Sequence, residues 1–209
     1  MNSKIVIALA ASAAVVVAGC AAMQGPTDPA LEAKAVEMMK VSFKEKGQAK
    51  LDRLNQDETQ AQCSIYTGRE LPKDVAEKIE RVNMATIKWP ADGKLVGDWK
   101  QGEKIAQEGR GFQYSDDPKG PSGANCYACH QLTRQEISYG TIGPSLYNFA
   151  KIRGFNDETR RYAWGKVFNA EAYNACSNMP RFGHNGILTE QQIRDVVALL
   201  VDPASPVNQ

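Results

Sequence analysis

The amino-acid sequence predicts an all-α fold. Apolar residues recur at helical spacing in several segments, and no segment of useful length alternates apolar and polar residues as a half-buried strand would. The chain has 209 residues, of which 43% are hydrophobic and 23% charged, as expected of a globular protein with a hydrophobic core. A single domain would leave about 70 residues for additional structure.

Residues 1–22 have the features of an export signal. Lys4 supplies a positive charge, and the run Ile5–Ala18 is apolar but shorter than the roughly 20 residues that span a bilayer, which disfavours an uncleaved anchor. Residues 17–20 resemble a lipoprotein box, whose cysteine, here Cys20, is acylated and becomes the first residue. Ordinary cleavage near Ala22 is the alternative. Both place the mature protein outside the cytoplasm, in the periplasm, with lipid anchoring through Cys20 left open.

Residues 23–92 are predicted to form a helical extension that carries no chemical motif. One amphipathic pattern covers residues 31–43, and a second runs from Leu71-Pro72 to about Trp89, with proline suited to a first helical turn. A polar stretch between them, residues 55–62, leads to Cys63. We expect this extension to wrap the core or to dock a partner.

Residues 93–209 are predicted to form the main domain. Residues 98–106 read as a short helix, and a loop rich in Gly, Asp and Pro follows. A further helix is expected from Asn156 to about Ala170. Thr189 starts a capping box, Thr-Glu-Gln-Gln, and the apolar residues after it form one face of a final helix.

Residues 126–130 read Cys-Tyr-Ala-Cys-His, the motif for covalent attachment of c-type haem. Two thiols three positions apart on a tight turn can each reach one vinyl group of the same porphyrin, and the adjacent imidazole is then held beneath the iron. A redox pair would not need the trailing histidine, and a zinc site would need a second ligand pair that the sequence lacks. We therefore expect one haem c attached to Cys126 and Cys129, with His130 as an axial ligand of the iron.

The second axial ligand is predicted to be Met179. It follows His130 by 49 residues, lies in an irregular segment, and precedes a helix that can brace it. His184, the other histidine of the chain, is the alternative. Among the other methionines, Met38 and Met39 have helical spacing and are expected in the core. A thioether paired with an imidazole raises the reduction potential relative to two imidazoles, which suits electron acceptance.

The order of these elements resembles that of small class I cytochromes c. These have a helix, the CxxCH turn, a Gly-Pro loop, a second helix, a methionine loop and a last helix. In that family the Gly-Pro turn places its backbone oxygen on the ring nitrogen of the histidine that faces away from the iron. The resemblance thus gives the carbonyl of Pro144 to His130 as a hydrogen-bond partner that fixes the ring.

The chain contains five cysteines, and two of them are left over from the signal and the haem motif. An even remainder in an oxidising compartment predicts a disulfide between Cys63 and Cys176. Two unrelated buried thiols are the alternative. The net charge of +1 gives no reason to expect nucleic acid or an acidic membrane as a partner.

The carboxyl-terminal region resembles one family more closely. Residues 174–193, with the segment Cys-Ser-Asn-Met-Pro-Arg-Phe-Gly at 176–183, and the ending at 198–208 are similar to SoxX, the monohaem subunit of the bacterial SoxAX complex. The resemblance extends over about residues 97–208. It implies the haem ligands Cys126, Cys129, His130 and Met179.

The resemblance also implies a role. SoxAX is an L-cysteine S-thiosulfotransferase that couples thiosulfate oxidatively to a cysteine of the SoxYZ carrier protein. The chain would be the electron-accepting subunit beside a SoxA-type cytochrome and would pass electrons to another cytochrome. No catalytic nucleophile is expected on it, and Cys176 in particular is not one. A free-standing periplasmic electron carrier is one alternative, and a haem protein with an open sixth site that binds ligands or peroxide is another.

Overall fold

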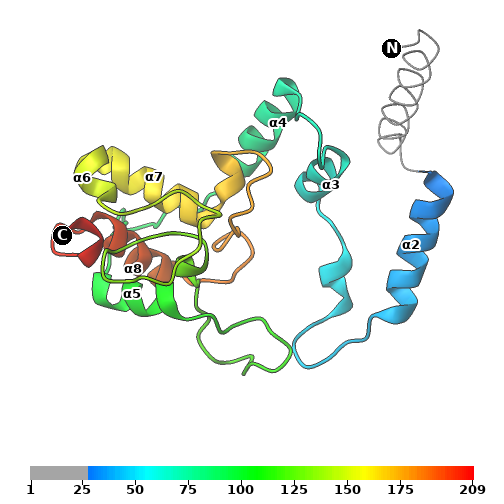
Figure 1. Cartoon of the computed structure of the whole chain (residues 1–209), viewed down its shortest axis with the longest axis horizontal. Helices are drawn as coiled ribbons and strands as arrows, with labels where there is room; N and C mark the ends of the chain where they lie inside the picture. The colour runs from blue at the N-terminus through cyan, green and yellow to red at the C-terminus, as the bar shows by residue number, and fades with distance from the viewer. Residues whose placement is uncertain (1–27) are drawn as a thin grey trace, which may run out of the picture. The chain divides into compact units, whose positions relative to one another are not determined.

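The computed structural model describes residues 28–209 (Figure 1). The expected signal at 1–22 and Cys20 lie outside the described residues. Within residues 28–209 all regular structure is helical, and an isolated bridge between Lys46 and Ala49 is the nearest approach to a strand there. The predicted all-α class is confirmed. No helix of this region is both long and apolar enough to cross a membrane.

The described residues divide into two compact units, one that ends at Lys44 and one that spans Glu45–Gln209. The first contains α2 (Pro29–Ser42), whose amino end is capped by the side chain of Asp28. No residue of α2 is buried, so Met38 and Met39, predicted to be core residues, are exposed instead. Helical spacing alone does not say whether an apolar stripe meets a surface of its own chain. The predicted start of the main domain at residue 93 stays a prediction.

The second unit begins with the 3₁₀ turn η1 (Leu51–Leu54), followed by α3 (Glu58–Ile65) and α4 (Lys73–Met84). Helix α4 begins directly after Pro72, close to the predicted start. Helix α3 lies where the sequence pattern indicates only a polar stretch. Its signal is a capping box: the Asp57 carboxylate accepts from the backbone N–H of Gln60, and the Gln60 side chain accepts from the backbone N–H of Asp57.

The remaining elements form the predicted main domain. They are α5 (Trp99–Gln107), η2 (Cys126–Ala128), α6 (Phe149–Arg153), α7 (Asp157–Phe168), η3 (Ala170–Ala172), α8 (Glu190–Val201) and η4 (Pro206–Asn208). The predicted capping box of the last helix is present, with Thr189 bonded to Gln192 in both directions. The Asn156 side chain likewise caps α7 by accepting from the N–H of Thr159.

Helices α5 and α8 cross at very short range (Figure 1). A Cβ on Gly102 would clash with the carbonyl oxygen of Asp195 and would lie 3.1 Å from the Cβ of Leu199. The Asp195 carboxylate also accepts from the backbone N–H of Asp98 at 2.9 Å. The closely packed core extends from this crossing to Trp164 of α7, and its fully buried members include Leu132, Ile193, Val197, Leu199 and Val207.

The extension between residues 55 and 90 packs on this core through buried polar groups. The Asn83 amide of α4 donates to the Thr59 hydroxyl and accepts from the Asn169 amide, each at 2.9 Å. Asn83 and Asn169 are 2% and 0% exposed, so these bonds are shielded from water. The indole N–H of Trp164 donates to the carbonyl of Lys88 at 3.0 Å. This segment of the extension therefore lies against the core, and its predicted role in docking a partner stays a prediction.

Candidate haem site

The CxxCH turn is built around a residue in left-handed conformation. Asn125, with φ of 45°, precedes the single 3₁₀ turn η2, and the carbonyl of Cys126 accepts from the backbone N–H groups of Cys129 and His130 at 3.1 and 2.9 Å. A left-handed residue reverses the chain direction, and asparagine adopts this conformation more readily than most residues. The turn therefore brings both cysteines and the histidine together on a short stretch of backbone.

Neither cysteine of this turn is in a disulfide. The Cys126 sulfur is buried although the residue as a whole is partly exposed, and burial raises the pKa of this thiol to about 12. A thiol held neutral in an apolar setting has no role as a thiolate nucleophile at neutral pH. It retains the S–H group that a vinyl addition consumes.

The imidazole of His130 is oriented by a single hydrogen bond. Its Nδ1 lies 2.7 Å from the carbonyl oxygen of Pro144. Because a carbonyl can only accept, Nδ1 carries a proton, and Nε2 is the ring nitrogen left to bind a metal. A neutral imidazole held by one nitrogen in this way presents the other as a metal ligand.

The partner loop of His130 is aligned with the haem turn by backbone bonds. The N–H groups of Gly140 and Gly143 donate to the carbonyls of Tyr127 and Cys129 at 2.8 and 2.9 Å. The N–H of Leu146 likewise donates to the carbonyl of Gln131 at 2.7 Å. These bonds fix the Pro144 carbonyl relative to the ring that it orients.

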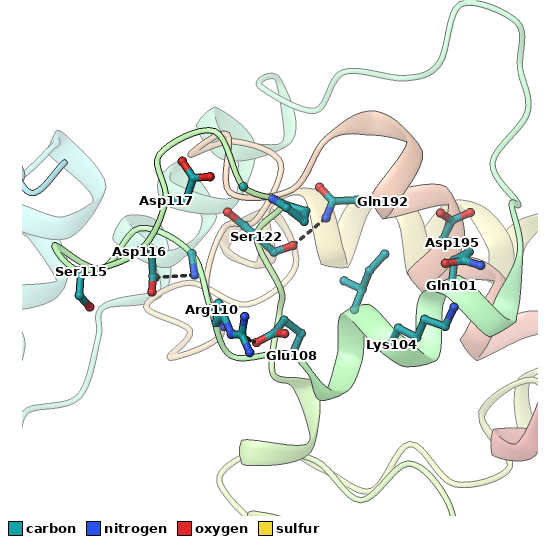
Figure 2. A pocket seen from close by; sticks show the side chains of 14 residues that line it. Gln101, Lys104, Glu108, Arg110, Ser115, Asp116, Asp117, Ser122, Gln192 and Asp195 are labelled. Atoms are coloured by element: carbon teal, nitrogen blue, oxygen red, sulfur yellow. Dashed lines mark hydrogen bonds and ion pairs between the residues drawn. The ribbon is translucent and has the colours of Figure 1, made fainter. Parts of the chain in front are cut away.

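The loop before the haem turn is fastened to α5 and α8 (Figure 2). The side chain of Gln192, on α8, donates to the carbonyl of Ser122 at 2.7 Å, and the Asp116 carboxylate accepts from the N–H of Gly111 at 2.7 Å. The N–H of Asn125 donates to the carbonyl of Glu108 at 3.0 Å. A pocket lies between this loop, α5 and α8, and none of the predicted haem ligands lines it. The contribution of this loop is to hold the start of the CxxCH turn.

Met179 is half-buried and packs against the hydrophobic core. Its backbone N–H donates to the Ser177 hydroxyl at 3.2 Å. The loop that carries it returns to the end of α7, where the carbonyl of Phe168 accepts from the N–H groups of Gly183 and His184 at 3.0 Å. We call this segment, residues 174–188, the methionine loop. Met179 therefore lies on a fastened loop next to the core, and its ligation of iron stays a prediction.

His184 is exposed, and its Nδ1 lies 3.2 Å from the Thr86 hydroxyl. Partial desolvation, followed by the nearby positive charge of Arg181, lowers the pKa of the ring below its ordinary value. One ring nitrogen is thus engaged by the extension at the surface. Its Nε2 is not engaged by this contact, and the choice between Met179 and His184 as the second axial ligand stays a prediction.

Cys63 and Cys176 form a disulfide in the structure, with a sulfur–sulfur distance of 2.09 Å and a sequence separation of 113 residues. It joins α3 to the methionine loop. Cys176 has φ of 60°, and its N–H and that of Ser177 donate to the carboxylate of Glu171 at 2.6 and 3.3 Å. Burial raises the pKa of Glu171, although these two N–H groups oppose the shift.

Sequence reasoning did not identify the residues that hold the methionine loop from outside. Arg181, whose side chain is 8% exposed, pairs with Asp57 at 2.5 Å, and the N–H of Ala175 donates to the Glu80 carboxylate at 3.2 Å. A charged residue inside an otherwise apolar loop segment, Pro-Arg-Phe, was the available signal for Arg181. No pattern near Asp57 in the sequence indicates that it pairs with Arg181, which lies 124 residues away.

The donor set fits a covalently bound haem. Two free thiols and one imidazole with a free Nε2 lie within residues 126–130. The turn that carries them packs against the hydrophobic core. Gly143 lies directly against that imidazole, so a side chain there would displace the ring. An all-α domain with such a turn defines the class of c-type haem proteins.

The comparisons with known proteins agree with this class. Residues 101–202 match the cytochrome c family, so this domain carries covalently attached haem c and transfers electrons. The chain is 36% identical to an uncharacterized lipoprotein of Aquifex aeolicus (strain VF5), over 100% of both chains, and it belongs to the same family as that protein.

Proposed function

We propose that Cys126 and Cys129 bind the haem covalently and that His130 and Met179 are its axial ligands. The observation that carries the assignment is the 2.7 Å bond from His130 Nδ1 to the Pro144 carbonyl, which leaves Nε2 free for iron. Bound haem supplies one-electron redox chemistry. His130 and Pro144 keep the ring orientation constant, Met179 favours the reduced state, and the buried core excludes water.

We further propose that the chain is the electron-accepting subunit of a SoxAX-type L-cysteine S-thiosulfotransferase. In that reaction a sulfur–sulfur bond forms between thiosulfate and a carrier cysteine, one proton leaves the thiol, and two electrons are released. None of the described cysteines is assigned as a nucleophile in this proposal, because Cys63 and Cys176 share a disulfide and Cys126 and Cys129 would be consumed by haem. The likeness of residues 174–193 to SoxX supports this role.

The relative from Aquifex is described as a lipoprotein. We extend this description to the chain and propose that it is exported to the periplasm and anchored by a lipid on Cys20. Labelling with a radioactive or clickable fatty acid tests the anchor, and Cys20→Ala should abolish the label while leaving haem content unchanged.

The experiment that tests the complex is affinity purification from cells grown on thiosulfate. The proposal expects a second, larger cytochrome and a SoxYZ-type carrier to co-purify, and it expects the haem of this chain to be reduced when thiosulfate and carrier are added together. Purification of the chain alone, with no reduction by thiosulfate and carrier, would instead favour a free-standing periplasmic electron carrier.

A further inference from the structure

The methionine loop is fastened on one side by the core and on the other by the extension. The bonds to the core, from Phe168 and Glu171, run within the predicted main domain. The bonds to the extension come from residues 57–88 and reach the loop at several points. They are the disulfide Cys63–Cys176, the ion pair Asp57–Arg181, the bond from the N–H of Ala175 to Glu80, and the contact of His184 with Thr86.

These contacts lie on both sides of Met179. Ala175 and Cys176 precede it, whereas Arg181 and His184 follow it. A loop that is held at both flanks loses most of its freedom to move its central residue. The extension is itself anchored to the core by the Asn83–Asn169 bond, so it can act as a fixed support.

We propose that residues 57–88 act as a clamp that keeps Met179 in place as the axial ligand, with Asp57 acting through Arg181 as a positioning residue. This inference rests on the proposed ligation by Met179. It gives the extension, which has no chemistry of its own, a defined role toward the haem. The relevant quantity is the fraction of molecules in which the methionine loop has swung away from the iron.

The ion pair is the part of the clamp that a single substitution can remove cleanly. Asp57 Oδ1 accepts from the Gln60 N–H as the cap of α3, and Oδ2 pairs with Arg181. In the variant Asp57→Asn the side-chain amide oxygen can still accept the Gln60 N–H, because asparagine is as good a cap as aspartate, but the side chain carries no charge. Asp57→Asn therefore breaks the ion pair and keeps the cap, whereas Asp57→Glu keeps the charge and weakens the cap.

A neighbouring pair supplies the control. Glu58, the next residue, pairs with Lys78 of α4 at 2.8 Å, and both side chains are well exposed. This pair lies within the extension and does not touch the methionine loop. Glu58→Gln removes the same kind of charge from the same helix without loosening the clamp.

In the test, the ferric holoprotein is titrated with imidazole. Binding is measured as the loss of the sulfur-to-iron charge-transfer band. Imidazole binds iron that Met179 has left, so its apparent dissociation constant is inversely proportional to the open fraction. We expect Asp57→Asn to lower that constant about tenfold, because a pair whose Arg181 side is buried stabilises by more than an exposed one. Asp57→Glu and Glu58→Gln should stay within about twofold of the parent protein.

Removal of the disulfide is the second arm. The double variant Cys63→Ser/Cys176→Ser leaves no free thiol to interfere with haem attachment, and we expect at least a roughly tenfold lower constant. Circular dichroism at the titration temperature shows whether each variant is folded, and the far more conservative Asp57→Asn keeps the test decisive if the double variant is not.

The inference is overturned if both the charge-removing and the disulfide variants bind imidazole as the parent does, or if Asp57→Glu lowers the constant while Asp57→Asn does not. The parent spectrum separates this failure from that of the ligand assignment. If the parent lacks the charge-transfer band before imidazole is added, Met179 is not the ligand, and the inference falls together with the assignment.

Discussion

Gly143 lies against the imidazole of His130, so closely that a Cβ at this position would overlap the ring atoms. The next residue, Pro144, supplies the carbonyl that orients the same ring. Gly143 has no positive φ, so glycine is needed here for space and not for backbone conformation. Gly143 therefore leaves room for the ring, and Pro144 orients it.

The variant Gly143→Ala should displace the His130 ring. We expect a lower yield of haem-bearing protein and a broadened or shifted electron paramagnetic resonance spectrum in the fraction that matures, because the ring must rotate away from the added methyl group. Gly186→Ala is the control for expression and haem attachment. A Cβ at this position meets nothing within 4 Å, although the positive φ of Gly186 adds some strain. An unchanged spectrum of Gly143→Ala would show that the ring is not constrained by this contact.

The crossing of α5 and α8 should be sensitive to one methyl group. Gly102→Ala gains about 1 kcal/mol of helix propensity but forces its Cβ into the Asp195 backbone and against Leu199. Overpacking of a buried contact with backbone costs about 1–3 kcal/mol, so the clash outweighs the gain. Denaturant unfolding should therefore give a net loss of up to about 2 kcal/mol. Gln101→Ala, on the exposed side of the same helix, should be neutral, and a stabilised Gly102→Ala would contradict the close crossing.

The Asp57–Arg181 pair gives the stability a defined pH dependence. Burial alone would raise the pKa of Asp57, but the Gln60 N–H and the Arg181 guanidinium outweigh it and lower the pKa below its ordinary value of 3.8. A carboxyl group with a lowered pKa in the folded state stabilises the fold above its unfolded pKa, and this stabilisation is lost as the pH falls through the folded pKa.

The difference in melting temperature between the parent protein and Asp57→Asn should consequently be clear near pH ~6 and should shrink near pH ~3. Because each comparison is made at one pH, titration of other groups cancels to a first approximation. A difference that is the same at both pH values would mean that the charge of the Asp57 carboxylate does not contribute to stability.

Patterns that lie within a few residues of one another predicted much of this protein. The CxxCH sequence and the capping box at Thr189 were sufficient to place the haem turn and the last helix. Asn156 marked the start of α7 for the same reason, since an amino-terminal cap acts through backbone N–H groups only two or three residues away. The absence of strand patterns was sufficient for the fold class.

Most contacts between distant residues were not predicted. The exceptions are the bond between His130 and Pro144, which the resemblance to cytochromes c implied, and one disulfide that the even remainder of cysteines predicted. Cys63 and Cys176 remained after the other cysteines were assigned, and the structure joins them. Nothing comparable relates Asp57 to Arg181, or Asn83 to Asn169, because any of many polar residues could have been the partner. The exposure of Met38 and Met39 was missed for a related reason: an amphipathic stripe shows that a helix can bury a face, not that the chain provides a surface for it.

The ferric absorption spectrum of Met179→Ala tests the central assignment most directly, with Met84→Ala as the matched control because Met84 is an exposed methionine at the end of α4. The account predicts that Met179→Ala loses the sulfur-to-iron charge-transfer band and gains rapid carbon monoxide binding in the ferrous state, while Met84→Ala resembles the parent. A Met179→Ala spectrum identical to that of the parent would contradict the account and would transfer the ligand to His184.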